Sequence, residues 1–460
     1  MNILFCSSEV VPFAKTGGLA DVAGALPIAL EHEGHQVRVA LPKYKMVKEE
    51  SDSAVIGEAI KVHLIRNDEL YMRDGIYGDE KGDYPDNLER FMFYCRQTLE
   101  LMKSEGFRPD IIHCNDWQTG LIPVYLKTVY KDDPFFKDTR TLFTIHNLAY
   151  TGSFEESEFD KTGLDRALFS IDGLEYYGKF SLLKGGLVFS DAITAVSPTY
   201  AKEIQTKEYG CGMEGILKAR SADLYGVLNG IDYELWDPAK DALIYEKYSP
   251  SSIEGKCTNK ERLLADMGMK TAAGAPLIGT VGRLAYQKGY DILAEVMDEL
   301  CGMDIGFILL GTGEERYHKI FEEIASRGNS KISINLCFDA ALAQKIYAAS
   351  DMFLMPSRYE PCGLGQLISF KYGAVPVARK TGGLADTVFE YDAKTGDGNG
   401  FLFEKAEPQE LLGAIKRAVE AHKDGPGWQR LITKIAGYDF SWDKSAQEYT
   451  RIYEKLKAKK

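Results

Sequence analysis

The sequence contains one short pattern twice, and its residue types suit the binding of a phosphate or a sugar. Residues 15–22 are Lys-Thr-Gly-Gly-Leu-Ala-Asp-Val, and residues 380–387 repeat them with only the last residue changed. Paired glycines let a backbone approach a ligand closely, and the N-terminus of a following helix offers N–H groups and a positive dipole end. For a single copy, a tight turn with a solvated lysine would be the better explanation. The recurrence favours a ligand cradle in each half of the chain.

Two cations follow the apolar run 277–281, in Gly282-Arg283-Leu284 and Gln287-Lys288-Gly289. A guanidinium grips a diphosphate through two N–H groups, whereas an ammonium acts as a point charge. The formal net charge of the chain is −13, so an anionic ligand needs a local basic site within an unfavourable overall field. Ordinary surface charge is the alternative for both cations.

Carboxylates and an imidazole follow three further apolar runs. Glu360 lies in Pro-Ser-Arg-Tyr-Glu-Pro-Cys-Gly-Leu-Gly, residues 356–365. There it is placed to accept sugar hydroxyls, or else to stabilise the dipole of the next helix. His146 follows residues 141–145, and Asp116 with Trp117 follows residues 110–114. An acid and an indole at such a place suit the edge and the face of a sugar, although a structural histidine and a core tryptophan are the simpler interpretations.

Several classes of function are disfavoured by the rest of the sequence. The acidic balance argues against nucleic-acid binding. The eight cysteines include no Cys-x-x-Cys pair, so neither a zinc site nor a disulfide framework is indicated. Gly311-Thr312-Gly313 lacks the third glycine of a dinucleotide fingerprint. No apolar run approaches the roughly 20 residues that span a bilayer. The N-terminus resembles a buried strand and not a signal peptide, so we expect a cytoplasmic protein without a membrane contact.

These candidate residues need parallel strands to position them, and the sequence supplies an alternation of strand, turn and helix. We expect strands at residues 3–6, 36–40, 110–114, 141–145, 192–196, 225–228, 277–281, 306–310, 332–338, 352–355 and 375–378. A helix is expected over residues 19–33, ending at Gly34, and another over 442–457. The fold class is therefore α/β with two doubly wound domains, joined near residue 240.

Taken together, the motifs resemble those of bacterial glycogen synthases and plant starch synthases, glycosyltransferase family 5. The matching segments run in family order over the whole chain: residues 8–22, 113–120, 144–152, 229–232, 282–289, 356–363 and 381–387. The resemblance implies the GT-B arrangement of two Rossmann-like domains facing across a cleft. The implied domains are 1–240 on the glucan side, 241–437 on the nucleotide side, and a C-terminal helix at 438–460 that packs back on the first.

The resemblance also implies roles for individual residues. Those expected to hold the nucleotide diphosphate are Arg283, Lys288, Lys15, Gly382 and Gly383, with Gly17, Gly18 and Thr381 completing the two cradles. Those expected around the glucose and the acceptor are Glu360, Cys362, Gly363, Leu364, His146, Asn229, Asp21 and Asp116. Phe338 falls where the family stacks an aromatic ring on adenine, usually a tyrosine. We expect Glu360, Lys288, Arg283, His146 and Asp21 to act in catalysis, without a metal or another cofactor.

The implied activity is the transfer of glucose from ADP-glucose to the non-reducing end of an α-1,4-glucan, with retention of configuration and release of ADP. In the family the leaving phosphate is thought to take the acceptor's proton on the same face of the sugar, and Glu360 then positions the sugar. The alternatives are a UDP-glucose enzyme, a transferase with another acceptor, a pyridoxal-phosphate phosphorylase, and a catalytically inactive glucan-binding protein. Transferases of the sucrose and lipid-sugar type usually carry a second glutamate where this chain has Ile368. A monomer and a homo-oligomer are both compatible with the sequence.

Overall fold

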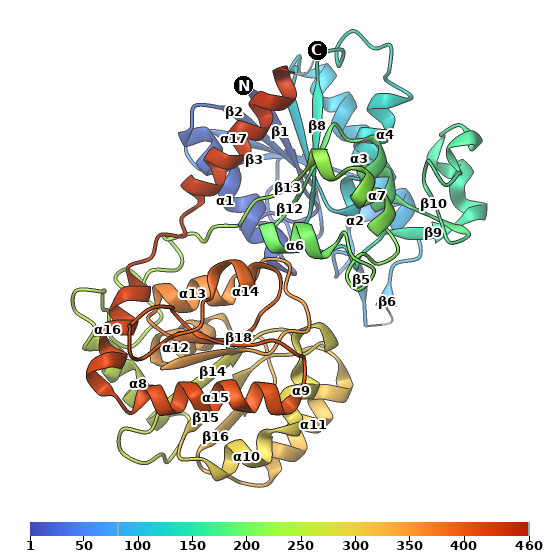
Figure 1. The fold of residues 1–460 in the computed structure, drawn as a ribbon. Helices are drawn as coiled ribbons and strands as arrows, with labels where there is room; N and C mark the ends of the chain where they lie inside the picture. The colour runs from blue at the N-terminus through green and yellow to red at the C-terminus, as the bar shows by residue number, and fades with distance from the viewer. Residues whose placement is uncertain (81, 459–460) are drawn as a thin grey trace. The chain divides into compact units, whose positions relative to one another are not determined.

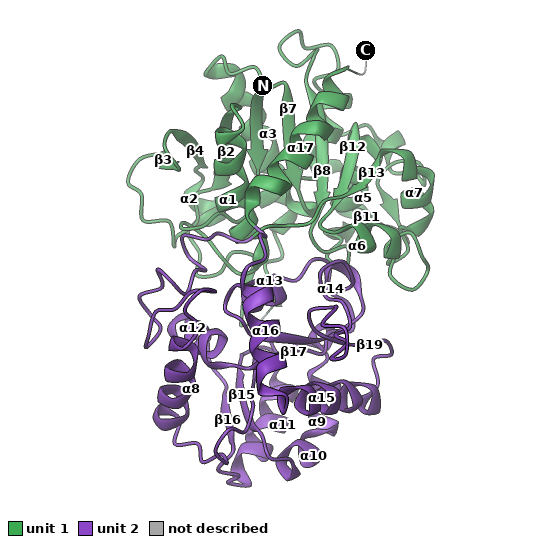
Figure 2. Ribbon diagram, turned by 60° about the vertical axis from the view of Figure 1, so that its left-hand side comes forward, with its two compact units in different colours: residues 1–230, 441–460 green, residues 231–440 purple. Residues whose placement is uncertain are grey.

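Alternating strands and helices build two parallel sheets, each in its own unit of the chain (Figure 1). The computed structural model describes residues 1–80 and 82–458. Unit 1 consists of residues 1–230 with 441–460, and unit 2 of residues 231–440 (Figure 2).

The sheet of unit 1 has the strand order β13-β12-β8-β7-β1-β2-β4-β3. Neighbouring strands are parallel except β3, which runs antiparallel to β4 at one edge. The strand bounds in this order are Leu224–Gly226, Ala192–Ala195, Arg140–Ile145, Ile111–Asn115, Asn2–Cys6, Gln36–Pro42, Ile60–Ile65 and Ser53–Ile56. A small antiparallel sheet joins β10 (Glu175–Tyr176), β11 (Lys179–Ser181) and β9 (Ser153–Glu155), and β5 (Gly78–Asp79) pairs with β6 (Gly82–Asp83).

Helices cover both faces of this sheet (Figure 1). They are α1 (Gly18–His32), α2 (Asp68–Tyr71), α3 (Asn87–Ser104), α4 (Leu121–Lys127), α5 (Leu182–Phe189), α6 (Pro198–Glu203), α7 (Glu214–Ala219) and α17 (Trp442–Ala458). The chain leaves α1 through Gly34 at φ +83°, a conformation that suits glycine. The expected helix over residues 19–33 is confirmed.

The C-terminal helix α17 belongs to unit 1, although it follows unit 2 in the chain. Its apolar side chains, among them Trp442, Tyr449 and Tyr453, are buried in the same core as α1 and β1. The Tyr453 hydroxyl lies 2.7 Å from Nδ1 of His113, which is fully buried on β7. Burial lowers the pKa of His113, so the contact joins a neutral imidazole to the helix.

The sheet of unit 2 is parallel throughout, with the order β16-β15-β14-β17-β18-β19. The strand bounds in this order are Ile332–Asn335, Gly306–Leu310, Leu277–Val281, Met352–Met355, Val375–Arg379 and Phe401–Phe403. The helices are α8 (Gly255–Asp266), α9 (Tyr290–Glu295), α10 (Met297–Gly302), α11 (Glu315–Ser326), α12 (Ala340–Ala349), α13 (Gly365–Lys371), α14 (Gly382–Thr387), α15 (Pro408–His422) and α16 (Gly425–Ala436).

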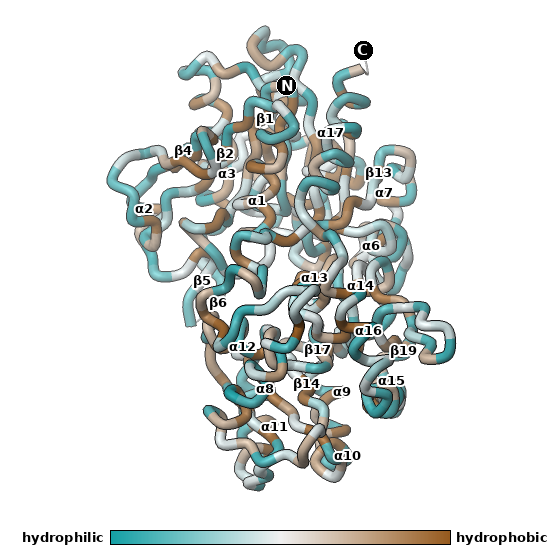
Figure 3. The backbone as a smooth tube through the Cα atoms, turned by 90° about the vertical axis from the view of Figure 1, so that its left-hand side faces the viewer, coloured by the Kyte–Doolittle hydropathy of each residue, from teal (hydrophilic) through white to brown (hydrophobic). Residues whose placement is uncertain are grey.

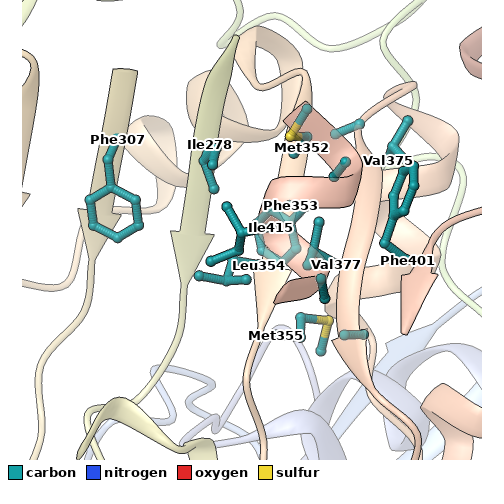
Figure 4. Packing of buried hydrophobic residues seen from close by; sticks show 14 of the residues in the cluster. Ile278, Phe307, Met352, Phe353, Leu354, Met355, Val375, Val377, Phe401 and Ile415 are labelled. Atoms are coloured by element: carbon teal, nitrogen blue, oxygen red, sulfur yellow. The ribbon is translucent and has the colours of Figure 1, made fainter. Parts of the chain in front are cut away.

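Continuous apolar runs in the central strands form the core of each unit, as expected for sheets covered on both faces. Figure 3 shows the hydrophobic stretches running through the interior of the units and the hydrophilic ones mainly in the outer loops. In unit 2, side chains from β14, β17 and β18 meet Ile415 of α15 in this core (Figure 4). These rigid sheets fix the positions at which the loops begin.

The strands expected from the sequence are confirmed, with bounds that differ by a few residues. The largest difference lies in β16, which ends at Asn335, so Phe338 lies in the following loop and not in the strand. The strands β3, β4 and β19 and the short strands β5, β6, β9, β10 and β11 were not expected from the sequence. Among the described residues, no helix has the length and hydrophobicity that crossing a membrane would require. The same residues contain no cluster of three or more His, Cys, Asp or Glu side chains that could hold a metal ion.

Candidate active site

Nearly all the candidate residues lie in loops that follow the carboxyl ends of parallel strands, where α/β sheets bind their ligands. In unit 1 the strands β1, β7, β8 and β13 precede Lys15, Asp116, His146 and Asn229. In unit 2 the strands β14, β16, β17 and β18 precede Lys288, Phe338, Glu360 and Thr381. Each sheet therefore gathers its own candidates at one edge.

In unit 1 the first Lys-Thr-Gly-Gly loop is held by a buried carboxylate that the sequence analysis did not single out. Glu9 is 4% exposed. Its Oε2 accepts the backbone N–H of Thr16 at 2.5 Å and that of Gly17 at 3.0 Å. Its Oε1 accepts the hydroxyls of Thr16 and Tyr77, both at 2.7 Å. These four hydrogen bonds replace the hydration of the carboxylate and fix the loop ahead of α1.

The same loop presents Lys15 at the surface, and its Nζ lies 2.6 Å from Oδ1 of Asp21. A Cβ built on Gly17 would meet nothing within 4 Å, so there is space beside the loop. Because the N–H of Gly17 already donates to Glu9, that group is not directed at an outside phosphate in this structure. The lysine side chain, which is 44% exposed, is therefore the group of this loop that can reach an outside anion.

Asp116 and His146 are brought together at the ends of β7 and β8. Oδ1 of Asp116 accepts the backbone N–H of His146 at 2.7 Å. Asp116 is buried, and it has φ +55°, a left-handed conformation that is uncommon outside glycine. Burial raises the pKa of Asp116 to about 7. The residue is therefore poised to gain or lose a proton near neutral pH.

His146 is held as a neutral imidazole. Its Nε2 lies 2.9 Å from Oδ1 of Asn115, whose amide nitrogen donates to the carbonyl of Cys6 at 2.9 Å. With that amide orientation Nε2 must carry the proton, which leaves the lone pair on Nδ1. Burial lowers the pKa of His146 to about 3. The ring is therefore suited to hydrogen bonding with a sugar and not to an ion pair with a phosphate.

Asn229 and Trp117 complete the candidates of unit 1. Asn229 is 6% exposed, and its Oδ1 has no hydrogen-bond partner among the described residues. A buried acceptor without a partner is costly, and a ligand hydroxyl would satisfy it. Trp117 packs edge to face on Phe91, with the ring centroids 4.9 Å apart. A Cβ on Gly152 would lie 2.4 Å from the indole, so the glycine allows the chain to pass close to the ring.

In unit 2 an ion pair joins Lys288 to Glu360, a residue that is 4% exposed. Nζ of Lys288 lies 2.9 Å from Oε1 and 2.7 Å from Oε2 of Glu360. The hydroxyl of Ser357, which the sequence analysis did not identify, also donates to Oε2 at 2.8 Å. An ammonium and a carboxylate thus share a half-buried site between the loops after β14 and β17.

The second Lys-Thr-Gly-Gly loop packs directly against the backbone around Glu360. A Cβ on Gly382 would lie 1.9 Å from the Glu360 carbonyl oxygen, and one on Gly383 would lie 2.0 Å from that of Cys362. The N–H of Gly383 donates to the Glu360 carbonyl at 3.1 Å. Both glycines are therefore needed for this contact, and the N–H of Gly383 is occupied by it.

The remaining candidates of unit 2 lie in the loops after β14, β16 and β17. Arg283 is exposed directly after β14. Phe338 is 84% exposed between β16 and α12. Gly363 has φ +75°, and Leu364 directly precedes α13. In unit 1 a cavity of about 350 Å³ lies between β4 and α3, but it is lined by none of the candidate residues.

Comparisons with known proteins place these features in a family. Residues 2–219 match the family model described as the starch synthase catalytic domain, and residues 269–425 match that of glycosyl transferases group 1. The chain is 48% identical to a glycogen synthase of Geotalea uraniireducens, with both chains covered completely. It is 45% identical to a glycogen synthase of Thermotoga maritima, over 100% of this chain and 99% of the other.

Solved structures agree with this assignment. The catalytic domain of starch synthase IV from Arabidopsis thaliana, bound to ADP and acarbose, superposes with a TM-score of 0.90. It is 34% identical over 99% of each chain. A sucrose-phosphate synthase from Thermosynechococcus elongatus, at 17% identity and a TM-score of 0.67, shares the fold. The fold and the site thus define a GT-B glycosyltransferase. The chain belongs to the glycogen and starch synthase family, and its function is the transfer of glucose in glycogen synthesis.

Proposed function

We propose that the chain transfers glucose from ADP-glucose to the non-reducing end of an α-1,4-glucan, with retention of configuration and release of ADP. The observation that carries the proposal is the Lys288–Glu360 pair, held at 2.7 Å beside the second glycine loop. It offers one cation for a leaving diphosphate and one carboxylate for sugar hydroxyls. The starch synthase IV structure, which contains ADP and acarbose, supports this choice of donor nucleotide and acceptor.

The chemistry of the proposal follows from where charge develops. Cleavage of the anomeric bond places negative charge on the departing diphosphate and positive character on the sugar ring. Lys288, Arg283 and Lys15 stabilise the first, most strongly where water is excluded. Substrate phosphate would then compete with Glu360 for the ammonium of Lys288. We therefore expect Lys288 to be positioned by Glu360 in the free enzyme and shared with the diphosphate during transfer.

Retention is proposed to occur on one face of the sugar, with the leaving phosphate taking the acceptor's proton. A double displacement would need a carboxylate free to attack the opposite face. Both oxygens of Glu360 are already engaged by Lys288, and one also by Ser357. Glu360 therefore acts by holding the sugar. We assign to His146 and Asn229 of unit 1 hydrogen bonds to sugar hydroxyls, and to Asp21 and Asp116 a role beside the sugar and the acceptor. Phe338 of unit 2 is assigned to stacking on the adenine.

We also propose that the protein works in the cytoplasm. All eight cysteines are free thiols in the structure, and Cys6, Cys95, Cys114 and Cys362 are buried. Unpaired cysteines are typical of reducing compartments, where disulfides are rare.

The experiment that tests the function is elongation of glycogen by the purified protein, with ADP-glucose and UDP-glucose in parallel. We expect faster elongation with ADP-glucose, and a loss of turnover of about 100-fold or more in Lys288→Ala and Glu360→Ala. Lys423→Ala is the matched control, because Lys423 forms an exposed ion pair with Glu420 within one turn of the chain. A preference for UDP-glucose would refute the adenine assignment of Phe338. Glucan binding without elongation from either donor would favour a binding protein.

A further inference from the structure

Arg358 lies two residues before Glu360, but its guanidinium is directed toward α9. Its Nη2 lies 2.5 Å from Oδ2 of Asp291, in the first turn of that helix. Its Cζ lies 4.3 Å from the centroid of the Tyr286 ring, which belongs to the loop that carries Lys288. Both partners of the ion pair are less than one-third exposed. A planar guanidinium that pairs on one edge and stacks on one face is held in a single orientation.

The backbone of Arg358 joins the same two loops. Its N–H donates to the carbonyl of Gln287 at 2.8 Å, directly before Lys288 in the chain. The side-chain amide of Gln287 returns a hydrogen bond to the carbonyl of Tyr359 at 3.4 Å. Gly289 passes so close that a Cβ there would lie 1.9 Å from the carbonyl oxygen of Pro356. The residues on either side of Lys288 are thus fastened to the residues ahead of Glu360.

A third loop is tied to the same residue. Arg379, the last residue of β18, donates through Nη1 to the carbonyl of Arg358 and through Nε to the carbonyl of Glu404 at 2.8 Å. The Lys-Thr-Gly-Gly loop that packs on Glu360 begins at the next residue, Lys380. Arg358 is therefore the point at which the loops after β14, β17 and β18 are connected.

We propose that Arg358 and Asp291 form a positioning pair that holds Lys288 and Glu360 in register for glucosyl transfer. This inference rests on the proposed role of those two residues in the reaction. The guanidinium of Arg358 is engaged by Asp291 on one edge and by the Tyr286 ring on one face, both within its own unit. Arg358 thus acts through the loops and not on the substrate.

A double-mutant cycle tests the pair by comparing Arg358→Ala, Asp291→Ala and the double variant. A displacement of reacting groups by about 1 Å can cost about 100-fold in rate, so we expect kcat to fall about 10- to 100-fold in each single variant. The double variant should be no worse than the poorer single one, because the two residues act together. KM for ADP-glucose should stay within about threefold, since ligand contacts persist in a slower enzyme.

Two further variants keep the test decisive. Arg358→Lys keeps the charge without the planar stacking, so its kcat should lie between those of the wild type and Arg358→Ala. Arg327→Ala, which breaks an Arg–Asp pair with Asp298 at the end of α11, should retain the wild-type rate. Melting temperatures of all variants show whether a loss of rate reflects unfolding.

Each alternative result has one meaning. Wild-type kcat in Arg358→Ala would overturn the proposal. So would a large loss in Arg358→Ala beside a normal rate in Asp291→Ala, because Arg358 would then contact the substrate directly. Should Arg358→Ala not fold, wild-type kcat in both Arg358→Lys and Asp291→Ala would equally overturn it. A wild type without glucosyl transfer would refute the proposed function instead of the positioning pair.

Discussion

The two copies of the Lys-Thr-Gly-Gly loop allow one substitution to be made in two different surroundings. Gly382 and Gly17 occupy the same position of the repeat. A Cβ on Gly382 would lie 1.9 Å from the carbonyl oxygen of Glu360, and its φ is +46°. A Cβ on Gly17 would meet nothing within 4 Å, and its φ is −150°. Gly382→Ala and Gly17→Ala therefore form a matched pair.

The expected magnitude follows from this contact. Side-chain Cβ atoms essentially never approach closer than 3.0 Å, so alanine at Gly382 must separate the two loops by about 1.1 Å, the difference between 3.0 and 1.9 Å. The left-handed backbone costs alanine about 1 kcal/mol more. Because the opposing atom is the backbone of Glu360, the carboxylate moves with it. A shift of about 1 Å predicts a loss of about 100-fold in kcat.

Gly17→Ala should leave the fold unchanged. The extended backbone accepts alanine, and the cost at the helix N-terminus is about 1 kcal/mol or less. The melting temperature should therefore fall by no more than about 3 °C. If this open space receives the donor phosphate, the rate will fall although the protein remains folded.

The assay is glycogen elongation from ADP-glucose at saturating donor, together with a melting curve for each variant. Gly382→Ala at the wild-type rate would refute the reasoning, because the contact with Glu360 would then have no bearing on the reaction. An equal loss of melting temperature in both variants would also refute it, since only one of the two glycines is closely packed.

Three further predictions concern unit 1. Glu9→Ala removes the acceptor for the Thr16 and Gly17 amides and should reduce kcat/KM by about 10- to 100-fold. Glu9→Gln keeps one oxygen for these amides, so its kcat/KM should stay within about tenfold of the wild type. Equal losses in the two variants would show that the charge of Glu9 matters and not its hydrogen bonds to the loop. Burial raises the pKa of Asp116 to about 7, so its contribution to stability is fully present below pH about 4 and is lost as the pH rises through about 7. The melting temperature of Asp116→Asn relative to that of the wild type should therefore increase between pH 4 and 8. A difference that stays constant over this range would contradict the prediction. Tyr453→Phe leaves Nδ1 of the buried His113 without its partner, while Nε2 keeps the Thr144 hydroxyl. The free energy of unfolding, measured by urea denaturation, should fall by about 1–3 kcal/mol with the elongation rate unchanged, and an unchanged unfolding midpoint would contradict this.

The sequence predicted most of the strands because their apolar runs are continuous and end at glycine, proline or charged residues. It also predicted that Lys288 and Glu360 follow strands of one sheet, and the structure brings their side chains together. The short strands β3 and β19 were missed because Ser53–Ile56 and Phe401–Phe403 are too brief to show a pattern. Local patterns thus identified the elements, and the parallel sheet then determined which loops meet.

The residues that hold the candidates in place were harder to predict. Glu9 and Tyr77 are 68 positions apart, and their hydrogen bond depends on the loop ahead of β5. Arg358 lies two residues before Glu360 in a motif rich in glycine and proline, and its place in the sequence does not show where its charge is directed. Only the position of Asp291 on α9 shows that its charge is directed elsewhere. Contacts between distant segments carry no local signal, and these positioning residues depend on them.

The repeated pattern shows most clearly what a short motif does and does not determine. In both copies the residues produce a turn from a strand into a helix, as paired glycines and the following apolar residues require. In unit 1 a separate carboxylate, Glu9, binds the loop and leaves space beside its glycine. In unit 2 the loop itself fills that space against the backbone of Glu360. The same residues therefore present Lys15 at the surface, paired with Asp21, in one unit and pack against the backbone of Glu360 in the other.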